Sequence, residues 1–134
     1  MTPFNLKIVT PDGLIFDGQA EELIVRTTSG DVAILARHIN YVAPLGMGRA
    51  VVVFGGQRRA AACIGGMLSV VDGEVTLVPT TFEWADKIDV ERAEASQRRA
   101  DAVLKDKNTS DTELRLAQAR LRRALVRKSV ASHK

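Results

Sequence analysis

The chain changes character in the stretch at residues 78–97, which reads VPTTFEWADKIDVERAEASQ. Before it lie short β-branched runs closed by turns, whereas residues 85–134 contain no Gly and no Pro and are rich in Ala, Arg, Glu and Leu. Gly and Pro are the strongest breakers of helices, so this composition predicts strands before the stretch and helices after it. We therefore expect two domains, a β-domain over residues 1–84 and a helical region over residues 85–134.

Upstream of this stretch, short apolar runs alternate with turn sequences. Residues 4–10 alternate apolar and polar side chains with period two, the pattern of a half-buried strand. Turn residues such as Pro11-Asp12-Gly13 and Asp72-Gly73 separate the runs. The residues alone predict eight or nine strands, a number typical of a sandwich or barrel. The runs lie at residues 4–10, 14–16, 23–27, 32–35, 47–54, 58–64, 67–71 and 75–78.

Downstream, small apolar residues recur at helical spacing. Two such series predict two helices of about 18 residues, in the order expected for an antiparallel hairpin. Asp86 or Asp89 can cap the first helix, and residues 110–113, Ser-Asp-Thr-Glu, form a capping-box signature for the second. The seam is mostly Ala, which predicts a weakly held hairpin. The series are Val90, Ala93, Gln97, Ala100 and Leu104, then Leu114, Ala117, Leu121 and Ala124.

Composition also excludes several classes of function. One Cys and two His offer neither a metal cluster of the usual spacing nor a nucleophile–base pair, so we expect no catalytic residue and no metal site. The start of the chain lacks the pattern of a signal peptide, and no apolar run has the length of a membrane span, so a cytosolic protein is expected. Residues 115–134 carry seven Lys/Arg and no Asp/Glu, which leaves a small nucleic-acid-binding module with a basic helix as the alternative. The aromatic residues are scattered rather than interleaved with the basic ones, which argues against that alternative.

Four segments carry a resemblance to a known family. They are residues 9–18 (VTPDGLIFDG), 29–38 (SGDVAILARH), 65–70 (GGMLSV) with 75–78 (VTLV), and 88–93 (IDVERA). In this order and spacing the chain resembles the epsilon subunit of bacterial F-type ATP synthases over nearly its whole length.

The resemblance implies an N-terminal antiparallel β-sandwich of about ten strands, followed by a C-terminal antiparallel two-helix hairpin. It implies a non-catalytic subunit of the central stalk that couples rotation of the c-ring to the catalytic head and inhibits ATP hydrolysis through its mobile helices. Gamma, the c-ring and the beta/alpha subunits are the implied partners, with the basic tail facing an acidic beta segment and no nucleic acid involved. The implied location is the cytoplasmic face of the bacterial cell membrane, peripheral and reached only through the complex. The implied complex translocates protons or sodium ions.

The resemblance also implies binding residues. No cofactor is required, but ATP is implied as a regulatory ligand held by Glu83, Ile88, Asp89, Arg92, Ala93, Arg99, Arg123 and Arg127. Asp31, Arg37 and His38 are implied to lie in the loop that contacts the stalk and ring. Two positions depart from the family pattern, since Arg37 stands in place of the usual Gly and Asn40 in place of the usual Pro.

From the residues alone, two interpretations of the arginines stay open. Arg92 and Arg99 are seven apart and Arg123 and Arg127 four apart, so each pair projects from one helix face, and the two pairs can converge on one end of an antiparallel hairpin. Arginine forks suit phosphate oxygens, and Asp89 can accept from an adenine amino group or a ribose hydroxyl. Alternatively, Asp89 only caps its helix and the arginines are solvated charge.

Overall fold

The computed structural model describes residues 2–132 and divides into two compact units, Met1–Trp84 and Ala85–Lys134. The expected β-sandwich followed by a two-helix hairpin is confirmed.

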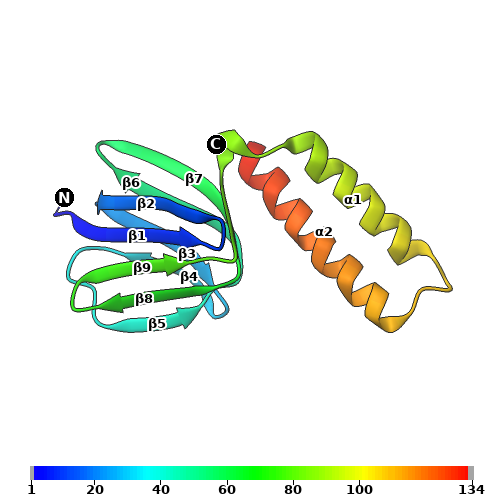
Figure 1. Ribbon diagram of the computed structural model, residues 1–134, viewed down its shortest axis with the longest axis horizontal. Helices are drawn as coiled ribbons and strands as arrows, with labels where there is room; N and C mark the ends of the chain where they lie inside the picture. Colours follow the sequence, from blue (N-terminus) through cyan, green and yellow to red (C-terminus); the bar gives the residue numbers. More distant parts are fainter. Residues whose placement is uncertain (1, 133–134) are drawn as a thin grey trace. The chain divides into compact units, whose positions relative to one another are not determined.

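The first unit is a sandwich of two five-stranded sheets (Figure 1). One sheet has the strand order β2-β1-β9-β8-β5 and the other β10-β7-β6-β3-β4. All pairs are antiparallel except β1 with β9, which are parallel. The strands are β1 Phe4–Thr10, β2 Gly13–Ala20, β3 Glu22–Thr27, β4 Gly30–Ile34, β5 Tyr41–Pro44, β6 Met47–Phe54, β7 Gln57–Ile64, β8 Met67–Val71, β9 Glu74–Val78 and β10 Thr81–Trp84.

Alternation of side chains builds the core between the sheets. In β1, Phe4, Leu6 and Ile8 are buried, while Asn5 and Lys7 point outward. Because successive side chains of a strand face opposite sides, each strand gives one row of apolar side chains to the interior. The core cluster comes entirely from the first unit, and aliphatic residues supply most of it.

The apolar runs of the sequence did not predict two of the ten strands. β5 has only four residues and ends at Pro44, and β10 lies within the stretch where the composition changes. Both are edge strands, and each is held by one partner, β8 or β7. Short edge strands owe their form to the neighbouring strand rather than to a pattern of their own, so period-two alternation does not reveal them.

The second unit contains the 3-10 turn η1 (Ala85–Lys87) and the helices α1 (Val90–Lys105) and α2 (Asp111–Ser132). The helices run antiparallel side by side (Figure 1). The Lys128 Nζ donates to Gln97 Oε1 at 2.8 Å and fixes their register. The seam between them is made of buried alanines: Ala93 and Ala100 from α1, and Ala117 and Ala124 from α2.

The helix ends follow the capping signals. Of the two candidate caps, Asp89 is the one used, and its Oδ1 accepts from the Arg92 backbone N–H at 3.0 Å. In the capping-box sequence, Ser110 Oγ accepts from the Glu113 N–H at 3.2 Å. Val90 was expected on the buried face, but 41% of it is exposed, because the first residue of α1 lies at the margin of the seam. No helix among the described residues is long and apolar enough to span a membrane.

Candidate functional site: an arginine face on the hairpin

The four arginines singled out by sequence lie on one side of the hairpin. At about 100° per residue, Arg92 and Arg99 lie about 100–120° to one side of the buried Ala93 position on α1. By the same rule, Arg123 and Arg127 lie about 80–120° to the same side of the Ala117 position on α2. In an antiparallel pair these two flanks face the same way, so the four residues form one surface. We call Arg92, Arg99, Arg123 and Arg127 the arginine face.

The arginines are not gathered at one end of the hairpin. The bond between Gln97 and Lys128 places Arg99 and Arg127 at nearly the same level, with Arg123 one turn further along. Arg92 lies about 10 Å from Arg99 along α1, toward the open end of the hairpin. The arginine face therefore has a cluster of three guanidinium groups at mid-length and a fourth nearer the start of α1.

Acidic side chains of α1 occupy the other flank. Glu94 and Asp101 lie about 80–100° to the opposite side of Ala93, away from the arginine face. Lys105 lies on that flank too, about 120° from Ala93, so the flank is mixed in charge.

Asp89 extends the arginine face toward the start of α1. Its carboxylate is exposed, and Oδ1 is engaged by the Arg92 N–H. A carboxylate offers two oxygens and about four acceptor sites, so the cap leaves capacity for a second donor. Capping and ligand binding by Asp89 are compatible.

The remaining residues implied for ATP are placed differently. Ala93 is 3% exposed and Ile88 9% exposed, so both pack in the interior rather than presenting polar groups. Glu83 is half-buried on β10 of the first unit, opposite Ala62 of β7. Among the implied residues of the second unit, only Asp89 and the arginines offer polar side chains to a ligand.

A separate arginine pair lies on another face of α2. Arg115 and Arg122 are seven residues apart, and both are exposed. They project about 140–160° from Ala117, on the side of α2 that points away from α1. Leu125, 45% exposed, lies beside them. We call Arg115, Arg122 and Leu125 the outer face of α2.

In the first unit, the three residues implied for the stalk and ring do not share a loop. Asp31 lies near the start of β4, where the Arg26 guanidinium donates to both of its oxygens, at 2.9 Å from Nε and 3.3 Å from Nη2. This bond from Arg26 lowers the pKa of the Asp31 carboxyl. Arg37 and His38 lie beyond the other end of β4, in the loop that joins it to β5.

The β4–β5 loop has a defined shape. Arg37 has a left-handed backbone with φ 64°, a conformation that suits the glycine implied by the resemblance at this position. The His38 N–H donates to Leu35 O at 3.2 Å, and its ring lies 5.8 Å from the Tyr41 ring. Asn40, the other departure from the family pattern, accepts through Oδ1 from the Asp72 N–H at 2.9 Å. Neither this bond nor the bond between Gln97 and Lys128 has a local sequence signal, because each joins residues more than 30 positions apart.

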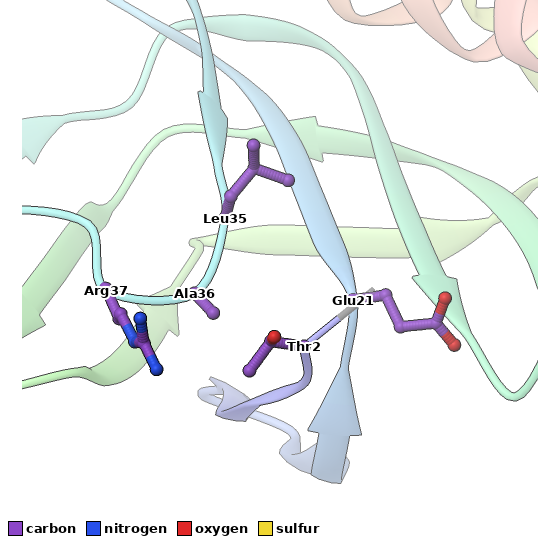
Figure 2. Close-up of a pocket in the computed structure, with 5 residues that line it drawn as sticks. All are labelled: Thr2, Glu21, Leu35, Ala36 and Arg37. Carbon is purple, nitrogen blue, oxygen red and sulfur yellow. The ribbon is translucent and has the colours of Figure 1, made fainter.

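A pocket of about 250 Å³ lies beside this loop (Figure 2). Arg37 lies at one side of the pocket and Glu21 at the other, with Leu35, Ala36 and Thr2 between them. The exposed Arg37 side chain points downward in this view, and the half-buried Glu21 side chain points away from the other four residues. The two charged groups do not converge on one ligand atom, so the pocket has no evident chemistry.

The described residues include neither a reactive cysteine nor a cluster of metal ligands. Cys63 is buried in the sandwich core, and desolvation raises the pKa of its thiol to about 12, so the reactive thiolate is suppressed. Within residues 2–132, no group of three or more His, Cys, Asp or Glu side chains is arranged to hold a metal ion.

Comparison with known proteins agrees with this architecture. The family model of the ATP synthase delta/epsilon chain β-sandwich domain matches residues 3–85, and that of its long α-helix domain matches residues 86–132. The ATP synthase epsilon chain of Ruminococcus albus is 44% identical over 135 residues and is aligned over 100% of both chains.

Solved structures share the fold. A chain of the Euglena gracilis mitochondrial ATP synthase, in an OSCP/F1/c-ring structure, matches with TM-score 0.84 at 20% identity, over 100% of this chain and 83% of that one. A chain of the Tetrahymena thermophila mitochondrial ATP synthase central stalk and c-ring matches with TM-score 0.64 at 12% identity, over 95% of both.

Proposed function

The chain belongs to the family of ATP synthase delta/epsilon chains, and on that premise we propose that it is a non-catalytic subunit of the rotating central stalk of an F-type ATP synthase. In this role it couples rotation of the c-ring to the catalytic head, and its C-terminal hairpin restrains ATP hydrolysis. It works at the cytoplasmic face of the bacterial membrane, which it reaches only through the complex.

ATP is the proposed regulatory ligand, and the arginine face is the observation that carries this part of the proposal. The cluster of Arg99, Arg123 and Arg127 suits the phosphate chain, because guanidinium forks match phosphate oxygens. Asp89, at the far end of the same surface, suits a donor on the base or ribose. The separation of these groups along the hairpin fits an elongated ligand that is charged at one end.

The outer face of α2 is proposed to contact the acidic segment of the beta subunit. Arg115 and Arg122 point away from the arginine face, so bound ATP would leave them available. Two separate arginine surfaces on one helix let a nucleotide and an acidic partner be recognised by different side chains.

The sandwich is proposed to contact gamma and the c-ring through its β4–β5 loop. Leu35 and Ile39 are 43% and 77% exposed there and, with Val42 at 62%, place exposed aliphatic side chains close together in sequence, in keeping with a contact surface.

Two measurements test this proposal. Calorimetry of the full chain with ATP should give saturable heat, and its absence at millimolar ATP would refute nucleotide binding. Complexes reconstituted with the full chain or with a chain lacking residues 86–134 should differ in ATP hydrolysis, with the truncated complex faster when ATP is scarce. Equal rates under all conditions would refute the regulatory role of the hairpin.

A further inference from the structure

Two loops at one end of the sandwich are tied together by a single side chain. Asn40, at the end of the β4–β5 loop, accepts through Oδ1 from the backbone N–H of Asp72 in the β8–β9 turn, at 2.9 Å. The two residues are 32 positions apart, so the bond joins segments that the chain brings together only on folding.

In the β8–β9 turn, the backbone N–H of Asp72 is not used by the pairing of the two strands. Val71 and Glu74 pair across the hairpin, and Asp72 and Gly73 between them both have positive φ, 49° and 82°. This is the geometry of a two-residue type I′ turn, for which Asp-Gly is a preferred sequence. The N–H of the first turn residue takes no part in the strand ladder, and Asn40 supplies its acceptor.

The β4–β5 loop, in contrast, is held in a demanding shape. Arg37 has φ 64°, which residues other than Gly, Asn and Asp seldom adopt. The hydrogen bonds within the loop are short-range: the His38 N–H donates to Leu35 O, and His38 Nδ1 lies 2.8 Å from Ile39 O. The strand ladder resumes at Tyr41, which pairs with Val70 of β8, and the Asn40–Asp72 bond extends this attachment by one residue into the loop.

The anchored loop carries the most exposed aliphatic side chain described in the protein, Ile39, between Leu35 and Val42, which are also exposed. An exposed apolar loop binds a partner more tightly when its bound shape is already formed, because less conformational entropy is lost on docking.

We propose that Asn40 is a positioning residue that locks the β4–β5 loop onto the β8–β9 turn and so presents Leu35 and Ile39 in a fixed arrangement to the partner subunits. The inference rests on the proposed function, in that the partner is the gamma–c-ring assembly. Asn40 itself need not touch that assembly.

The test compares full-length variants by amide exchange and by binding. Asn40→Ala removes the acceptor, and Asn40→Asp keeps an acceptor oxygen and is measured at high ionic strength to screen the Asp72 and Glu74 carboxylates. Asn5→Ala is the matched control, since Asn5 is also an exposed amide and donates to Glu74 Oε1 at 2.9 Å, a bond that does not involve the Asp72 N–H.

In Asn40→Ala, the Asp72 amide should exchange about three- to tenfold faster, the value of one net hydrogen bond, while the amides of β8 stay protected. Affinity for a purified gamma–c-ring assembly should fall by a similar factor while the sandwich stays folded. Asn40→Asp and Asn5→Ala should resemble wild type in both measurements.

Wild-type exchange at Asp72 in Asn40→Ala would overturn the inference, as would undiminished affinity or an equal loss of affinity in Asn5→Ala. Failure of the wild-type chain to bind the assembly would instead refute the proposed function, and the exchange measurement would still decide whether Asn40 holds the loop.

Discussion

Neighbouring arginines on α2 allow a sharp test of the arginine face. Arg122 and Arg123 are adjacent in sequence but point about 100° apart, so only Arg123 belongs to the arginine face. Replacing either by Ala removes one positive charge from the same turn of the same helix. Any long-range effect on an anion is therefore nearly equal in the two variants, and their difference isolates direct contact.

The expected magnitudes follow from this geometry. A charge-assisted hydrogen bond contributes about 1.5–3 kcal/mol, so Arg123→Ala should weaken ATP binding about 10- to 150-fold. The Arg122 side chain points about 100° away from Arg123 and does not belong to the arginine face, so screening over about 8 Å at physiological salt leaves Arg122→Ala within about threefold of wild type. Arg123→Lys keeps the charge but loses the fork, and should fall between them.

Calorimetric titration of the full chain with ATP measures the three affinities, and helical circular dichroism checks that each hairpin is formed. The reasoning fails if Arg122→Ala weakens binding as much as Arg123→Ala, because charge rather than placement would then explain the affinity. It also fails if Arg123→Ala binds ATP within threefold of wild type.

Four further predictions concern stability. Asp89→Ala should cost the hairpin about 1 kcal/mol by removing the cap on the Arg92 N–H, and Asp89→Asn should cost little, as measured by urea unfolding of the helical signal. Arg37→Gly should raise the unfolding free energy of the sandwich by up to about 1 kcal/mol, because glycine adopts φ 64° without strain; a gain equally large in Arg37→Ala would contradict this reason. Because burial raises the Cys63 pKa from 9.0 to about 12, the thiol stays protonated in the folded state while the unfolded thiol ionises. Its contribution to stability is complete below pH 9.0 and is lost as the pH rises toward 12, at up to about 1.4 kcal/mol per pH unit, and Cys63→Ala should lack that slope in denaturation measured across this range. Finally, a chain lacking residues 86–134 should still unfold cooperatively, since every residue of the core cluster belongs to the first unit, and a gradual, non-cooperative melt would count against this division.

Sequence patterns predicted the parts of the fold that depend on local rules. Alternation in β1 and the Asp-Gly turn before β9 follow from side-chain direction and backbone preference, which neighbouring residues decide. The sequence predicted the helix caps almost as well. It left Asp86 and Asp89 as equal candidates, and the structure shows Asp89 at the cap of α1.

Sequence patterns did not predict the features that depend on how distant segments align in the folded chain. β5 and β10 form because β8 and β7 provide the strand edges with which they pair. Asn40 contacts Asp72, which lies 32 positions away, only after the chain between them has folded. The arginine face, too, was predicted only in its local part. Spacing placed each arginine pair on one side of its own helix, but only the bond between Gln97 and Lys128 tells how far the two pairs are offset along the hairpin.

The composition of the hairpin seam explains why a ligand can matter to it. Four buried alanines form the centre of the contact between α1 and α2, beside half-buried leucines such as Leu104 and Leu121. At about 0.8 kcal/mol for each buried methyl group, the alanines supply about 3 kcal/mol. One or two charge-assisted bonds to the arginine face are of the same size. A ligand that engages Arg99 from α1 and Arg123 or Arg127 from α2 crosses the seam, and so adds its binding energy to the contact that closes the hairpin. Larger side chains in the seam would hold the hairpin closed without a ligand. With alanine there, the free energy that a ligand of the arginines contributes is comparable with that of the seam itself.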